Sequence, residues 1–124
     1  MTWSLIARDR PTGAFGIAVA TKNFAVGSRV PFIESGVGAI ATQALVNPFY
    51  GVHGLAFLQD EMPPADIIKI LTEGDEGREQ RQVHMMDRHG RIAAYTGKDC
   101  VDWCGSTAGE GFSVAGNMLA GPAV

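Results

Sequence analysis

The second residue of the chain combines two groups that can act together in catalysis. If Met1 is removed, Thr2 carries both a side-chain hydroxyl and a free α-amine. The hydroxyl can attack a carbonyl carbon and the amine can accept the proton that the hydroxyl loses. One residue would therefore supply the nucleophile and the base for amide cleavage. The alternative is that Thr2 is only the first residue of a strand, with its hydroxyl bonded within a sheet.

Other polar side chains stand at the ends of apolar segments, where they can converge in a folded pair of hairpins. A cation from Lys22 or Arg29 near the Thr2 amine would lower the pKa of that amine and make it a better base. A backbone N–H near Gln43 could stabilise an oxyanion. The alternative is ordinary polarity at strand ends. The same segments supply four candidates for substrate binding, namely Thr21, Asn23, Thr42 and Asn47.

The rest of the sequence offers little other chemistry. It contains neither a GxSxG elbow nor a GxxxxGK[ST] phosphate loop. The three histidines, His53, His84 and His89, are scattered, and we interpret each as structural. The two cysteines stand in CVDWC, a spacing that is not typical of a metal site, and we expect free thiols. We therefore expect neither a metal nor a cofactor.

Composition favours a single folded domain over residues 1–124. Hydrophobic residues make up 46% of the chain and charged residues 19%, which argues against disorder. The net charge of −3, without a basic cluster, argues against nucleic acid and anionic membranes as partners. Without a long apolar run or a signal peptide in the sequence, we expect a cytoplasmic location.

Patterning predicts strands, then helices, then strands. We expect strands over 2–8, 14–21, 30–34 and 38–45, helices over 47–59 and 62–73, and strands over 82–87, 91–96 and 112–119. The segments GIAVA and GAIA are apolar on both strand faces, which predicts a sheet covered on both sides. We expect 2–8, 14–21 and 38–45 to be central strands of one layer, with both helices on its outer face.

Three blocks carry a resemblance to a known family: TWSLIARDRPTGAFGIAVATKNFAVGSRVPF, GVGAIATQALVNPFYGVHGL and GEGFSVAGNMLAGP. They resemble a bacterial family of unknown function that is placed with the N-terminal nucleophile (Ntn) hydrolases. The resemblance implies an α+β fold, a four-layer αββα sandwich of two antiparallel sheets with helices outside. Members of the family are generally longer, so we expect this chain to be the N-terminal part of a longer domain.

The resemblance also implies roles for particular residues. In proteasome-like members a Thr starts the first strand, a Lys begins the third, and a backbone turn after the fourth forms the oxyanion hole. The matching positions of this sequence are Thr2 for the nucleophile, Arg29 for the lysine and the backbone near Gln43 for the oxyanion hole. Arg29 departs from the pattern because an arginine stays charged and cannot act as a base, and Lys22 is the other cation within reach.

Two functions follow as expectations. The first is an amidohydrolase that cleaves a small amide or peptide-like bond with Thr2 as nucleophile. The second is a binding or interaction module that keeps the fold without the chemistry, which a retained Met1 would favour. Because the last predicted strand, 112–119, has no following element to cover it and would be an unpaired apolar strand, we expect a homodimer that buries part of this region.

Overall fold

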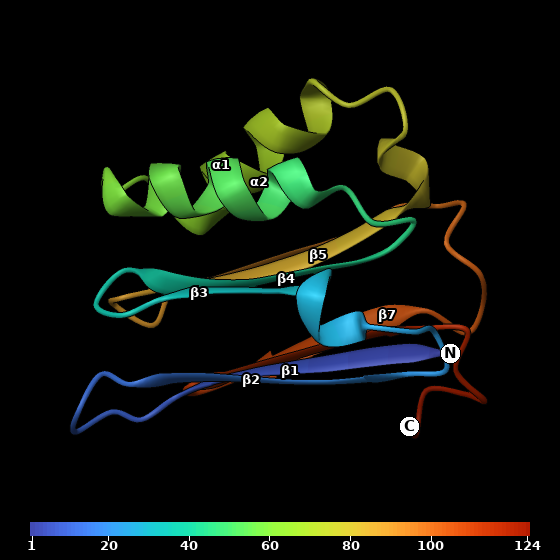
Figure 1. Cartoon of the computed structure of the whole chain (residues 1–124), viewed down its shortest axis with the longest axis horizontal. Coiled ribbons are helices and arrows are strands. Elements are labelled where there is room, and N and C mark those ends of the chain that lie inside the picture. The colour runs from blue at the N-terminus through green and yellow to red at the C-terminus, as the bar shows by residue number, and fades with distance from the viewer.

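The computed structural model describes all 124 residues as three stacked layers, with two helices above one sheet and a second sheet below it (Figure 1). The elements, in chain order, are β1 (Thr2–Arg8), β2 (Phe15–Thr21), the 3₁₀ turn η1 (Val26–Ser28), β3 (Pro31–Glu34), β4 (Gly38–Ala44), α1 (Pro48–Gln59), α2 (Pro64–Glu73), the 3₁₀ turn η2 (Arg78–Gln80), β5 (Arg81–Asp87), β6 (Ile92–Thr96), β7 (Gly105–Gly109) and β8 (Phe112–Asn117). The fold is therefore mixed α+β.

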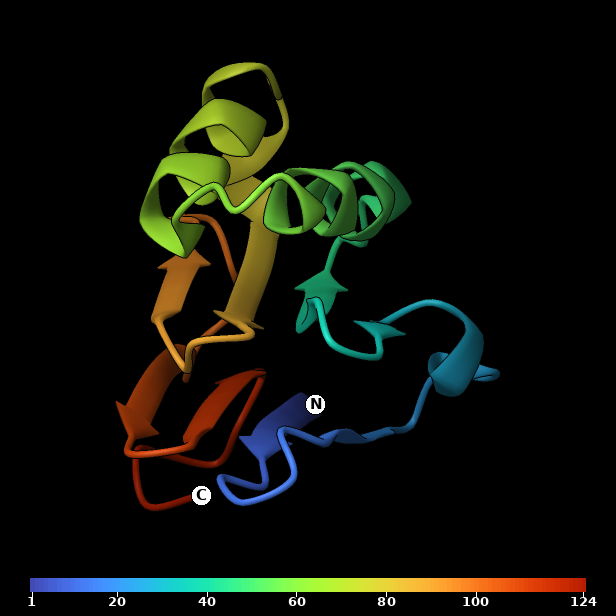
Figure 2. The ribbon, with the colours of Figure 1, turned by 90° about the vertical axis from the view of Figure 1, so that its left-hand side faces the viewer.

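The strands form two antiparallel sheets of four strands each. Sheet I has the order β2-β1-β8-β7, and sheet II has the order β3-β4-β5-β6. The prediction that β1, β2 and β4 share one layer is wrong, because β4 lies in sheet II and β2 is an edge strand of sheet I. The chain changes sheets between β2 and β3, through η1, where Ala25 adopts a left-handed conformation with φ of 58°. Figure 2 shows this crossing at one side of the stacked layers.

The two apolar faces of β4 have different partners, as the sequence predicted for a strand covered on both sides. Ile40 packs into a core beneath the helices, together with Tyr50 and Leu58. Ala39 and Ala41 point the other way, into a smaller core between the sheets that includes Ile6 and Met86. Because successive side chains of β4 point to opposite faces of the sheet, one strand contributes to two cores.

Helix α1 begins where the sequence predicts. The Asn47 side chain accepts a hydrogen bond from the Phe49 backbone N–H, and Pro48 occupies the first turn. Two glycines, Gly51 and Gly54, lie on the buried face of α1. A Cβ at Gly51 would overlap the ring of Phe32 on β3, so this glycine permits the helix to approach the sheet closely.

We predict that Gly51→Ala destabilises the protein by about 1–2 kcal/mol, because overpacking against Phe32 outweighs the gain in helix propensity. Urea unfolding measures the change in the free energy of unfolding. Gly16→Ala is the matched control, because a Cβ at Gly16 meets no atom within 4 Å. A Gly51→Ala variant as stable as the parent would contradict the close packing.

Strand β8 differs from its prediction. It ends at Asn117 and is paired on both sides, by β1 and by β7, a strand that the sequence did not predict. The expectation that this strand is left without a neighbour is therefore wrong. The helices lie on the far side of sheet II (Figure 1), so the outer face of sheet I is covered only in part, by Trp103 and the C-terminal residues, and its Trp3, Leu5 and Val114 are partly exposed.

We still predict a homodimer, and we expect its interface to lie on the outer face of sheet I. Burying partly exposed apolar side chains there would remove them from water. Light scattering is expected to report a dimer, and Leu5→Glu is expected to shift it to monomer. A protein that stays monomeric at high concentration would contradict the prediction.

Candidate active-site cleft

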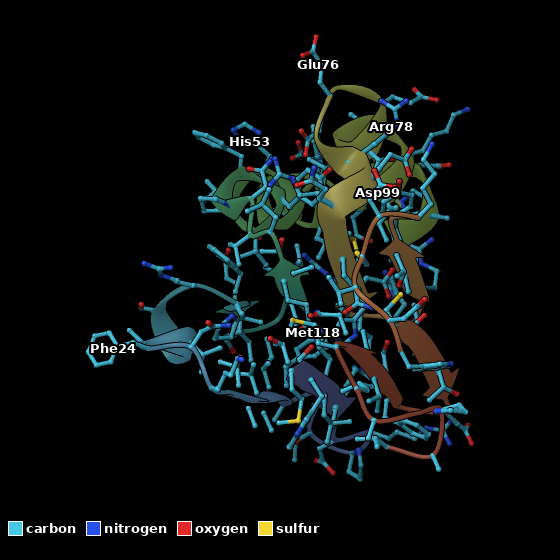
Figure 3. All side chains as sticks on the ribbon, turned by 90° about the vertical axis from the view of Figure 1, so that its right-hand side faces the viewer. Phe24, His53, Glu76, Arg78, Asp99 and Met118 are labelled. Atoms are coloured by element: carbon cyan, nitrogen blue, oxygen red, sulfur yellow. The ribbon has the colours of Figure 1, made fainter.

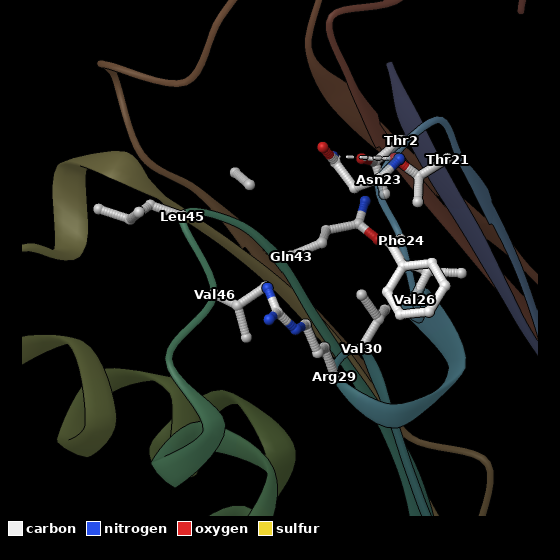
Figure 4. Close-up of a pocket in the computed structure, with 11 residues that line it drawn as sticks. Thr2, Thr21, Asn23, Phe24, Val26, Arg29, Val30, Gln43, Leu45 and Val46 are labelled. Atoms are coloured by element: carbon white, nitrogen blue, oxygen red, sulfur yellow. Dashed lines mark hydrogen bonds between the residues drawn. The ribbon is translucent and has the colours of Figure 1, made fainter.

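Two adjoining cavities open at the end of the molecule where β1 begins and β4 ends. Cavity 1 has a volume of about 320 Å³ and cavity 2 of about 260 Å³. Four residues line both: Thr2, Asn23, Ala44 and Leu45. The cavities therefore form one cleft, with sheet I supplying one wall and the end of β4 the other (Figure 4).

The cleft gathers most of the residues singled out from the sequence. Cavity 1 is lined by five of the eight: Thr2, Thr21, Asn23, Arg29 and Gln43. The other three do not line either cavity: Lys22, Thr42 and Asn47. The Lys22 side chain is exposed, Thr42 is fully buried, and Asn47 caps α1. Arg29 is thus the only cation that lines either cavity.

The Thr2 hydroxyl lies in a short chain of hydrogen bonds. Its Oγ1 is 3.0 Å from Thr21 Oγ1, and the Thr21 hydroxyl donates to the Met1 carbonyl at 2.8 Å. Because Thr21 has one hydroxyl proton, Thr2 must be the donor in the contact between them. Thr2 is only 7% exposed, and this bonding within the sheet is what a structural strand residue would show, although Thr2 also lines both cavities.

Ala44, rather than Gln43, turns its backbone N–H toward the cleft. The Thr42 N–H donates to the Val30 carbonyl, on the side of β3. Peptide N–H groups alternate along a strand, so the Gln43 N–H faces β5 and the Ala44 N–H again faces the side of β3. Beside Ala44 the neighbouring segment is η1 rather than β3. The Ala44 N–H donates none of the turn or loop backbone hydrogen bonds.

Ala44 is also strained. Its φ of 66° lies in the left-handed region, which costs a non-glycine residue about 1 kcal/mol or more. This conformation ends β4 at the cleft.

The Gln43 side chain belongs to a buried polar network behind the cleft. Its amide Nε2 donates to Gln82 Oε1 at 2.8 Å and to the Ala115 carbonyl at 3.1 Å. Its Oε1 accepts from the Ser4 hydroxyl at 2.6 Å. Because these bonds join β4 and β5 to β1 and β8, the network fixes sheet I against sheet II directly beneath Thr2.

His84 on β5 continues this network. Its Nε2 lies 2.8 Å from Ser4 Oγ and its Nδ1 lies 2.8 Å from Ser113 Oγ. Ser4 gives its proton to Gln43, so His84 must donate from Nε2 and accept at Nδ1, which fixes the neutral tautomer. Burial lowers the pKa of His84 from 6.5 to about 4. The structural interpretation of His84 from the sequence agrees with this position.

Comparison with known proteins identifies the family of this chain. Residues 2–124 match DUF1028, a family of unknown function. The chain belongs to this family. It is similar to the crystal structure of protein SPO2555 from Silicibacter pomeroyi, also assigned to DUF1028, with a TM-score of 0.95 and 36% identity. The match covers 98% of this chain and 57% of SPO2555, so this chain spans little more than half of that protein. No curated protein matches.

None of the six residues of this DUF1028 chain that line cavity 2 alone was among the candidate site residues predicted from the sequence. Asn117, at the end of β8, pairs directly with Thr2 and is 3% exposed. Asp99 and Cys100 come from the connection after β6. Figure 3 shows Asp99 and Met118, both from the lining of cavity 2, on the same end of the molecule. Only the register of β8 against β1 would have revealed Asn117, and one sequence does not contain that register.

Three further observations concern the cysteines, possible metal ligands and possible membrane-spanning helices. Both cysteines of the DUF1028 chain are free thiols, as predicted. The structure contains no group of three or more His, Cys, Asp or Glu side chains that could hold a metal ion. None of its helices combines the length and apolar character needed to cross a membrane.

Proposed function

We propose that this DUF1028 chain carries the site of an N-terminal nucleophile (Ntn) amidohydrolase that cleaves a small amide or peptide-like bond. The observation that carries the proposal is the position of Thr2. It is the first strand residue, and it lies where the two cavities of the cleft meet. An amide bound across that junction would have one side in each cavity and its carbonyl beside the Thr2 hydroxyl.

The proposed reaction begins with the free α-amine of Thr2, after Met1 has been removed. The amine takes the hydroxyl proton while Oγ1 bonds to the amide carbon, giving a tetrahedral oxyanion. The C–N bond then breaks, the leaving amine takes a proton from the ammonium, and an ester to Thr2 remains. Water attacks the ester, with the same amine as base, and releases the acid.

Two groups that line cavity 1 are suited to the charges of this reaction, one to the oxyanion and the other to the Thr2 amine. The Ala44 N–H faces the side of the cleft, where it can donate to the oxyanion. The Arg29 guanidinium lines the same cavity without an ion pair of its own. Its positive charge would lower the pKa of the Thr2 ammonium and favour the neutral amine that acts as base. Arg29 itself does not transfer a proton.

Met1 keeps these groups in an inactive arrangement. It blocks the Thr2 amine as a peptide bond, and its carbonyl accepts the Thr21 hydroxyl proton at 2.8 Å. Removing Met1 therefore creates the base and also frees the Thr21 hydroxyl, which remains beside Thr2 Oγ1. Thr21 is then able to hold the nucleophile in place.

The alternative function is a catalytically inactive Ntn-fold module that binds a ligand or a partner in the same cleft. The arrangement with Met1 present favours it, because Thr2 is nearly buried and its hydroxyl is bonded to the neighbouring strand. If this alternative holds, the chain that retains Met1 binds the ligand in the cleft as well as the chain that begins at Thr2.

Preparations with and without Met1 separate the two functions. We expect the chain that begins at Thr2 to hydrolyse members of a panel of fluorogenic acyl-amides, and the chain that retains Met1 to be inactive, because only the first has a base. Intact mass spectrometry defines each preparation, and circular dichroism verifies that both are folded. Equal hydrolysis by both preparations, or by neither, would contradict the amidohydrolase.

A further inference from the structure

The two cavities of the cleft carry charges of opposite sign. Cavity 1 contains Arg29 as its only charged residue, and cavity 2 contains Asp99 as its only charged residue. Neither side chain forms an ion pair within the chain. The cleft therefore presents a free cation on one side of Thr2 and a free anion on the other.

Around Arg29 the walls of cavity 1 are largely apolar. Val26, Val30 and Val46 line it, and the Arg29 guanidinium lies beside Val46 (Figure 4). An aliphatic stem would fit against these valines, with a carboxylate at its end placed to meet the guanidinium. A carboxylate is the group that a planar guanidinium binds with two parallel hydrogen bonds.

Cavity 2 offers hydrogen-bond acceptors to its occupant. Asp99 contributes a carboxylate. Asn117, although 3% exposed, uses only its amide Nδ2, which donates to Gln82 Oε1 at 3.1 Å. The Asn117 Oδ1 has no partner within the chain, and the residue lines the cavity beside Thr2. This oxygen is not one of the buried polar atoms without a partner, so it is open to the cavity, where it can accept a hydrogen bond from an N–H group of a ligand.

We propose that the cleft selects a small zwitterionic amide, with an acidic group in cavity 1 and an amino group in cavity 2. The inference rests on the proposed function for the position of the scissile bond, which would lie over Thr2. It adds the substrate class: a short peptide-like molecule with an anion on one side of that bond and a cation on the other. Asp99 and Asn117 are binding residues for the amine, and Arg29 is the binding residue for the acid.

Binding to the Thr2→Ala variant tests this substrate class without hydrolysis. Isothermal titration calorimetry uses six dipeptides, blocked at both ends so that only side chains are charged: Glu-Lys with its partners Gln-Lys and Glu-Gln, and Lys-Glu with its partners Lys-Gln and Gln-Glu. We expect one of the two oppositely charged orders to bind best. Each peptide that lacks one charge should bind roughly 3- to 10-fold more weakly, as expected for a partly exposed ion pair.

Variants that remove a charge test which cavity binds the acidic group of the ligand and which binds the amino group. In the Thr2→Ala background, Arg29→Gln should abolish the preference for Glu over Gln and keep the preference for Lys. Asp99→Asn should do the reverse. Arg10→Gln and Glu76→Gln are the matched controls, because both remove an exposed charge away from the two cavities and should change neither preference.

The outcomes separate this inference from the proposed function. Equal binding of all six dipeptides, or preferences that survive both cavity variants, would overturn the inference. Hydrolysis of uncharged amides by the chain that begins at Thr2, without a charge preference, would also overturn it while leaving the amidohydrolase intact. Charge-selective binding that disappears in the cavity variants would support it even if no hydrolysis is found, and would then favour the binding module.

Discussion

Thr2→Ala, in a chain freed of Met1, is expected to lower amide hydrolysis at least about 10³-fold, as loss of a nucleophile does. Alanine keeps the α-amine and removes only the atom that bonds to the substrate. The fold should survive, because Thr2 contributes one side-chain hydrogen bond, to Thr21, and the neighbouring ladder is unchanged. Initial rates on the fluorogenic amides measure the loss, and circular dichroism measures the fold.

Two further variants make this result specific. Thr2→Ser should retain activity, because the hydroxyl survives beside the same amine. Thr107→Ala, which changes an exposed threonine of β7 outside the cleft, should retain full activity. Activity in Thr2→Ala comparable to that of the parent would show that another group attacks the substrate.

Acidification is expected to destabilise the protein through His84. Its pKa is about 4 in the folded protein, against an ordinary value of 6.5. A folded pKa below the unfolded one means that the unfolded chain binds the proton more tightly. Stability is therefore complete above pH 6.5, falls as the pH is lowered, and has lost this contribution near pH 4. The full effect is about 3 kcal/mol, from 1.36 kcal/mol per pKa unit.

The surroundings of His84 explain why its charged form is so unfavourable. Its two partners are the hydroxyls of Ser4 and Ser113, so no carboxylate bonded to the ring offsets a positive charge. The side chain is fully buried between the sheets. A proton on Nδ1 would also force Ser113 to give up its role as donor.

Urea unfolding at several pH values measures this effect. The parent should lose stability between pH 6.5 and pH 4, whereas His84→Gln should be less stable at pH 7 and should show a flatter pH dependence. His53→Gln removes an exposed histidine and serves as the control, with the same pH dependence as the parent. A parent and a His84→Gln variant with parallel pH profiles would contradict the assignment.

The local elements could be predicted from the sequence because their signals are local. Asn47 and Pro48 mark the start of α1 through cap chemistry, and Gly90, with φ of 81°, marks the turn between β5 and β6. Strand β7 was missed because its sequence, GSTAG, lacks the apolar alternation of the other strands.

The pairing of strands could not be predicted in the same way. β1 lies between β2 and β8, which are separated by about ninety residues, and nothing in one sequence specifies that register. For that reason the cleft was predicted from the β1, β2 and β4 ends but without Asn117. The direction of each backbone N–H at the end of β4 likewise depends on which strands pair with β4, and one sequence does not contain that pairing.

The measurement that tests the central claim most directly is the site of a covalent adduct. A peptide-like β-lactone acylates a nucleophilic hydroxyl when the ring opens, which adds the full mass of the probe. Intact mass spectrometry followed by peptide mapping should find one adduct, on Thr2, in the chain that begins at Thr2. It should find none in Thr2→Ala or in the chain that retains Met1. An adduct on another residue, or none on Thr2 when its amine is free, would contradict Thr2 as the nucleophile.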